Sequence, residues 1–140
     1  MTTERGADGS NILERVASRV KGFAKNNHLE KRHFDRIVHI LDMDGAFIDP
    51  ADIQEDPNAA APRYSPEKIC TKDVSGIEAR NKQKRECIRR LTEAKQLWGV
   101  PYQAYYMSCN LDHVLYDRLN LTDEEKENLS YEFAKRYECL

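Results

Sequence analysis

Hydrophobic and polar positions along the first part of the chain predict a helix followed by a buried strand. From about Asn11 to Asn26, apolar residues recur at helical spacing, so one face of the predicted helix is apolar. The segment from Ile37 to Leu41 is almost wholly apolar. Such a run is typical of a strand that is buried on both faces of a parallel sheet covered by helices.

The second half of the chain predicts a helix, a strand and two more helices. Apolar residues between Ile77 and Trp98 fall on one side of the first helix, and Gly99 is expected to cap its C-terminus. Residues 102–107 are rich in strand formers. Asn110 would open a further helix, and Thr122 with Glu125 fits a capping box for a last helix within residues 121–140.

Residues 49–76 lack periodicity and contain four prolines. This pattern predicts a long irregular loop. Connections of this length within a compact domain are usually lids or binding loops.

The order of these elements predicts one α/β domain over residues 1–140, with a short, mainly parallel sheet flanked by helices. Crossover connections between parallel strands are nearly always right-handed, so we expect the two strands to lie side by side and to point the same way. Their carboxyl ends would share one edge of the sheet, which is where function gathers in such folds. Asp112 and His113 would then lie on the same rim as Asp42 and Asp44.

Composition restricts the classes of function. The net charge is −2, and no apolar segment approaches the roughly 20 residues that a membrane-spanning helix needs. The four cysteines have no metal-ligand spacing, which argues against a zinc site and against a disulfide framework. We therefore expect a cytoplasmic protein with no membrane partner.

Two carboxylates, Asp42 and Asp44, follow the predicted buried strand and precede Gly45. Side chains two apart on an extended chain point to the same side, and two facing carboxylates favour a hard cation such as Mg²⁺. The alternative is a simple turn, since Asp and Gly are ordinary turn residues. His39 lies within the strand and is interpreted as a hydrogen-bonded core residue.

Basic residues cluster on the helix that precedes Gly99. Arg80, Lys84 and Arg85 are candidates for contact with a phosphate backbone, which would set affinity without reading sequence. A solvated helix face is the commoner meaning of such a run.

The segment from Asp42 to Gly45 resembles the DxD motif of the toprim domain, a metal-binding module of topoisomerases, primases and several nucleases. In that family, a glutamate from an earlier strand-to-helix turn completes the acidic site, and Glu4 in Glu4-Arg5-Gly6 resembles it. Residues 106–115 resemble, more loosely, the strand-to-helix segment of the RloB-like abortive-infection branch. The three elements occur in the family's order.

The resemblance implies a toprim-like domain that binds Mg²⁺, or Mn²⁺, through Glu4, Asp42 and Asp44. It implies nuclease-like action on phosphodiesters in nucleic acid, and a role in phage defence. Asp112 and His113 are candidates for a further ligand or an acid/base group; for Asp112, a favourable place at a helix N-terminus is the alternative. The sequence leaves open whether an ATPase partner protein is required.

Two other functions stay open. Only three residues precede Glu4, so the family's first strand would be short, and the chain is alternatively a non-catalytic regulatory or nucleic-acid-binding module on a degenerate toprim scaffold. A haloacid-dehalogenase-type phosphohydrolase also opens with DxDG on a buried strand, with Asp42 as nucleophile and Asp44 as acid/base. That family has Thr or Ser where Ala46 stands here.

Overall fold

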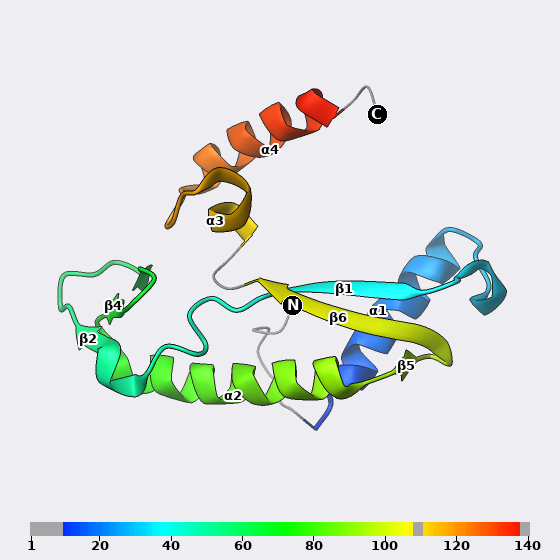
Figure 1. Cartoon of the computed structure of the whole chain (residues 1–140), viewed down its shortest axis with the longest axis horizontal. Coiled ribbons are helices and arrows are strands. Elements are labelled where there is room, and N and C mark those ends of the chain that lie inside the picture. The colour runs from blue at the N-terminus through cyan, green and yellow to red at the C-terminus, as the bar shows by residue number, and fades with distance from the viewer. Residues whose placement is uncertain (1–9, 108–110, 138–140) are drawn as a thin grey trace.

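The computed structural model describes residues 10–107 and 111–137 and has an α/β fold (Figure 1). The larger layer contains α1 (Ile12–Asn26), β1 (Ile37–Asp42), α2 (Val74–Glu93), β5 (Gln96–Leu97) and β6 (Val100–Met107). A smaller sheet contains β2 (Ile53–Glu55), β3 (Arg63–Tyr64) and β4 (Ile69–Thr71). Two helices, α3 (Leu111–Tyr116) and α4 (Asp123–Tyr137), follow, and short 3-10 helices span Lys31–His33 and Pro50–Asp52. The α/β class is therefore confirmed.

The two long strands pair as the sequence predicts. β1 and β6 are parallel neighbours, with Ile37 opposite Tyr102 and Asp42 opposite Met107. Their carboxyl ends therefore share one edge of the sheet, which confirms the inference drawn from the crossover rule.

The prediction that the sheet is mainly parallel is wrong. β5 pairs antiparallel with β6, so the three-stranded sheet in the order β1-β6-β5 is mixed. The cause is a hairpin at Trp98 and Gly99, whose φ angles of 55° and 68° fit a two-residue type I′ turn. Gly99 does supply a positive φ, but it serves this hairpin and not the C-terminus of α2, which ends at Glu93.

Residues 49–76 are not the irregular loop that was predicted. They contain β2, β3 and β4, which form a second mixed sheet in the order β2-β4-β3. A small apolar cluster of Ile53, Ile69 and Ile77 joins this sheet to α2. Strands of two or three residues carry too little alternation to be recognised in a sequence.

The main core lies on one face of the β1–β6 pair. Buried apolar residues from α1, β1, α2, β5 and β6 form a single cluster, which includes Leu41 and Leu91. The opposite face of β1 is open in the described part of the chain, where Val38 is 57% exposed and Ile40 58% exposed. The prediction of a strand buried on both faces is therefore wrong, and β1 alternates as a strand with one covered face does.

In the view of Figure 1, α3 and α4 lie on the side of the β1–β6 pair that is opposite to α2. The predicted capping box is confirmed, since the Glu125 carboxylate accepts from the Thr122 backbone N–H and the Thr122 hydroxyl accepts from the Glu125 N–H. α4 adds no residue to the core. None of its described residues is buried, and the ring of Phe133 lies beside those of Tyr116 and Tyr137.

Two further expectations concern a membrane-spanning helix and the cysteines. Across residues 10–107 and 111–137, no helix has the length and apolar character that a membrane crossing requires. Cys70 and Cys87 are free thiols.

Candidate functional site

The segment after β1 is a tight turn. The Ala46 N–H donates to the Met43 carbonyl at 2.9 Å, and Asp44 and Gly45 have φ angles of 44° and 67°. These angles fit a type I′ turn, for which Asp and Gly are favoured residues. Asp44 has therefore left the extended conformation on which the predicted facing of Asp42 and Asp44 depends. The prediction that the two carboxylates share one side of a strand is wrong on this point.

Side chains of α2 hold the backbone of this turn. Arg80 donates to the Asp44 carbonyl at 2.7 Å, Asn81 to the Gly45 carbonyl at 3.2 Å, and Arg85 to the Ala46 carbonyl at 2.7 Å. Asn81 and Arg85 are four residues apart and therefore lie on one face of the helix, and Arg80 directly precedes Asn81, so this part of α2 follows the turn closely. The turn is fixed by hydrogen bonds from residues that are 36 to 39 positions further along the chain.

Lys84, also on α2, forms an ion pair with the Asp44 carboxylate. The Lys84 side chain is 1% exposed, whereas 34% of the Asp44 side chain remains exposed. A buried ammonium is stable only when it is paired, so Asp44 is the group that allows Lys84 to be buried.

The basic residues proposed as phosphate contacts thus have partners within the chain. Arg80 and Arg85 donate to the turn, Arg80 also donates to the Tyr64 hydroxyl, and Lys84 is buried. We therefore do not assign these three side chains to a nucleic-acid contact surface.

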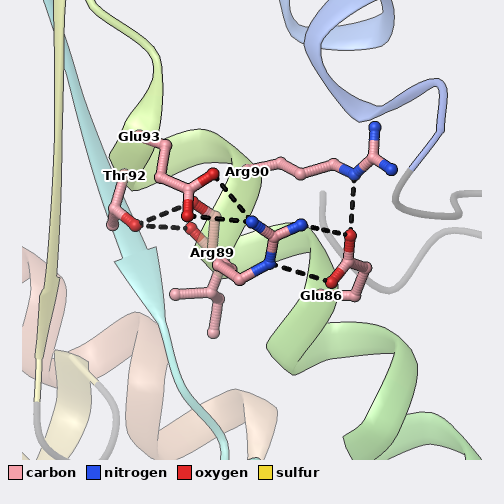
Figure 2. A network of polar contacts seen from close by, with 6 residues as sticks. Glu86, Arg89, Arg90, Thr92 and Glu93 are labelled. Atoms are coloured by element: carbon pink, nitrogen blue, oxygen red, sulfur yellow. Dashed lines mark hydrogen bonds and ion pairs between the residues drawn. The ribbon is translucent and has the colours of Figure 1, made fainter.

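The outer surface of α2 is a network of ion pairs (Figure 2). Glu86 accepts from Arg89 and Arg90, and Arg89 also donates to Glu93. Hydrogen bonds from Arg89 and then Arg90 lower the pKa of Glu86 to about 2. Positive charge on this part of the helix is balanced locally, as the solvated-face interpretation requires.

Residues from the turn after β1 and from α3 line one cavity of about 430 Å³. We call it the carboxylate cavity; its lining includes Asp44 from the turn, Asp112 from α3, Arg63 from β3 and Lys126 from α4. Lys126 Nζ lies 3.8 Å from an Asp112 carboxylate oxygen. The prediction that Asp112 lies on the same rim as Asp44 is therefore confirmed. Asp42, in contrast, is exposed and does not line this cavity.

Whether a metal ion fits here depends on the carboxylates. Among the described residues, no group of three His, Cys, Asp or Glu side chains is placed to hold one. Glu4, the predicted third ligand, lies outside the described residues. Mg²⁺ is commonly held by one or two carboxylates together with water and substrate phosphate, and Asp44 and Asp112 supply two that are both partly exposed. The two carboxylates are ligands of the type that a hard cation accepts, and each of them has a lysine partner.

A second cavity, of about 530 Å³, adjoins the first. We call it the aromatic cavity, and its lining includes Phe47, Tyr64 and His113 together with the acidic residues Asp49, Asp52 and Glu67. Tyr64 lines both cavities. Of these residues only His113 was predicted as functional. The others lie in or next to residues 49–76, where no periodicity indicated a structure.

Tyr64 is held in place from two sides. Its backbone exchanges two hydrogen bonds with the Asn120 side chain, both 2.8 Å long, and its hydroxyl accepts from Arg80. The Arg80 guanidinium lies 5.5 Å from the centroid of the Tyr64 ring. These contacts hold the ring in one position, where it lines both cavities.

His39 is confirmed as a hydrogen-bonded residue of the strand. Its Nδ1 lies 2.8 Å from the Tyr102 hydroxyl oxygen, within the half-buried part of the sheet. Burial lowers the pKa of His39 and raises the pKa of Tyr102 to about 12. Burial therefore favours the neutral form of both groups, and their hydrogen bond joins β1 to β6.

Comparisons with family models, with curated proteins and with solved structures found no match to this chain. The resemblance to the toprim domain and to its RloB-like branch therefore stays a prediction.

Proposed function

We propose that the chain is a Mg²⁺-dependent, phosphodiester-acting domain of the toprim-like type whose substrate is nucleic acid. The observation that carries the proposal is the carboxylate cavity, which joins two carboxylates from separate elements to two cationic side chains. Asp44 and Asp112 are suited to a divalent cation, and Arg63 and Lys126 to a phosphate group.

Within this proposal, each side chain has a defined task. Asp44 and Asp112 would hold the cation, with Asp42 and Glu4 as the further acidic residues that the resemblance implies. Arg63 and Lys126 would orient the phosphodiester, and His113, which follows Asp112, would serve as the acid/base group that the sequence suggests. When bound, Mg²⁺ would stabilise charge on the phosphate oxygens and lower the pKa of a bound water.

Cleavage assays test the proposal. Single-stranded and duplex DNA and RNA are incubated with the chain and with Mg²⁺, Mn²⁺ or EDTA. We expect cleavage that needs the metal and that Asp44→Asn and Asp112→Asn each reduce by about 100-fold or more, since groups of this kind contribute several kcal/mol to a rate. Asp35→Asn makes the same chemical change at an exposed position just before β1, and it should cleave normally.

Full metal-dependent cleavage by both cavity variants would contradict the proposal. Circular dichroism of each variant separates loss of activity from loss of fold, which matters because Asp44 also pairs with Lys84.

A second candidate function is a non-catalytic nucleic-acid-binding module. The observation in its favour is that both cavity carboxylates already have lysine partners, Lys84 for Asp44 and Lys126 for Asp112. In that case the chain would bind nucleic acid equally well in EDTA and in Mg²⁺, and no cleavage would occur in either condition. The assays above therefore distinguish the two functions directly.

A further inference from the structure

We propose that the aromatic cavity binds one unpaired base of a single-stranded nucleic acid, and that it prefers a base carrying an exocyclic amine. The inference deepens the proposed function and rests on it only in taking nucleic acid as the ligand. It assigns a substrate form, single-stranded, and a base preference to a cavity next to the proposed phosphate site.

The size and lining of the cavity suit a flat ring. Its volume of about 530 Å³ lies within the range of small-molecule sites, and its lining includes Phe47, Tyr64 and His113, which all carry aromatic rings. Phe47 is 55% exposed, so its ring is accessible to a ligand. Stacking of an unpaired base on an aromatic ring contributes about 1–3 kcal/mol and does not require a particular base.

The distribution of charge decides which part of a nucleotide enters which cavity. The described lining of the aromatic cavity contains Asp49, Asp52 and Glu67 and no lysine or arginine, so it repels a phosphate group. The carboxylate cavity contributes Arg63 and Lys126, which attract one. A nucleotide that lies across Tyr64, which lines both cavities, therefore places its phosphate beside Arg63 and Lys126 and its base in the aromatic cavity.

The same acidic residues give the preference among bases. Carboxylates accept hydrogen bonds and donate none when they are ionised. Cytosine, adenine and guanine present exocyclic amines that donate to such groups, whereas thymine has a carbonyl oxygen where cytosine has its amine. The Asp49 carboxylate already accepts from the Ala51 N–H at 2.9 Å, so Asp52 and Glu67 are the principal candidates for contact with the base.

A duplex is a poor ligand for this arrangement, because its bases are stacked and paired. Sequence-tolerant stacking on side chains is typical of proteins that bind unpaired strands. We therefore expect the chain to bind a single strand more tightly than the duplex of the same length.

Fluorescence anisotropy with short labelled oligonucleotides tests the inference. The measurements use the full chain in EDTA at neutral pH, so that metal binding and cleavage play no part. Oligo(dC) and oligo(dT) form the matched pair of ligands, since both are pyrimidine strands of equal charge. We expect oligo(dC) to bind about 5-fold or more tightly than oligo(dT), the ratio that corresponds to one good hydrogen-bonded contact.

Two variants probe the cavity, and a third is the control. Phe47→Ala should weaken binding of both strands by about 5-fold or more, because it removes the stacking ring. Glu67→Gln should reduce the preference for oligo(dC) and leave oligo(dT) nearly unchanged. Phe23→Ala removes a phenylalanine of similar exposure, 59%, from α1, and it should bind as the unaltered chain does.

Each outcome has a defined meaning. Equal binding of the two strands together with no effect of Phe47→Ala would overturn the base pocket, and so would tighter binding of the duplex. Binding that depends on salt but not on Phe47 would assign the affinity to phosphates alone and also contradict the inference. Metal-dependent hydrolysis of a small phosphodiester that carries no base does not involve the aromatic cavity. Such hydrolysis would support the proposed function even if every result above contradicted the base pocket, so the two proposals can fail separately.

Discussion

The ion pair between Asp44 and Lys84 predicts an asymmetry in stability. Lys84 is 1% exposed, so Asp44→Ala leaves a buried ammonium without its carboxylate. Loss of one partner of a buried pair typically costs about 3–5 kcal/mol. Lys84→Met instead leaves a carboxylate that water reaches at 34% exposure, and its cost should be smaller, about 1–2 kcal/mol.

Urea unfolding followed by circular dichroism measures both free energies. The double variant Asp44→Ala/Lys84→Met carries no uncompensated charge and should be more stable than Asp44→Ala alone. Lys82→Met removes an exposed lysine from the same helix and should change stability by less than about 0.5 kcal/mol. Equal costs for the two single variants, or a double variant no more stable than Asp44→Ala, would refute the assignment of Lys84 as a buried partner.

Three further predictions concern the turn, the core and the strand. Gly45→Ala should lower the free energy of unfolding by about 1–2 kcal/mol, because φ is +67° and the new Cβ would lie 3.0 Å from Ile69 Cδ1. Gly22→Ala in α1 meets nothing within 4 Å and should raise it by about 0.5–1 kcal/mol. No effect of Gly45→Ala in urea unfolding would be a contradiction. Leu91→Ala, at a fully buried position, should cost about 2–5 kcal/mol in the same assay, and a cost below about 1 kcal/mol would mean that the core is wrongly placed. Burial lowers the pKa of His39 from its usual 6.5, so the unfolded chain binds this proton more readily than the folded chain. The free energy of unfolding should therefore fall as the pH drops below 6.5 through the lower pKa of the folded state. His39→Gln should reduce this dependence on pH, and an unchanged dependence would exclude His39 as its source.

The sequence predicts the parts of the fold that depend on long, regular patterns. α1 begins within one residue of its expected start, and β1 and β6 are adjacent and parallel because few other connections are allowed. From that pairing alone, Asp112 was expected on the rim that Asp44 occupies. The short strands β2, β3 and β4 were missed, because their pairing depends on contacts that are distant along the chain.

Lys84 shows why the candidate site was harder to predict than the fold. Periodicity assigns every lysine of α2 to the solvated side, since a charged residue is rarely buried without a partner. Its partner, Asp44, is 40 residues earlier in the chain, so no local pattern connects the two. Gly99 is ambiguous for a different reason, because helix caps and type I′ hairpins both use a glycine with positive φ.

Asp44 also shows the limit of the alternation argument. Two residues apart on a strand, Asp42 and Asp44 would face the same side, but a type I′ turn begins immediately after Asp42. A turn that starts one residue earlier or later moves a side chain to another part of the site. The sequence therefore indicates which carboxylates lie near the edge of the sheet, but not which of them share a cavity.

Calorimetric titration with Mg²⁺ and Mn²⁺ tests the central claim most directly, because it asks whether the carboxylate cavity holds a divalent cation at all. We expect saturable binding at millimolar metal in the unaltered chain and in Asp35→Asn, and loss of that binding in Asp112→Asn. Absence of any binding heat for either metal, or unchanged binding by Asp112→Asn, would contradict the account.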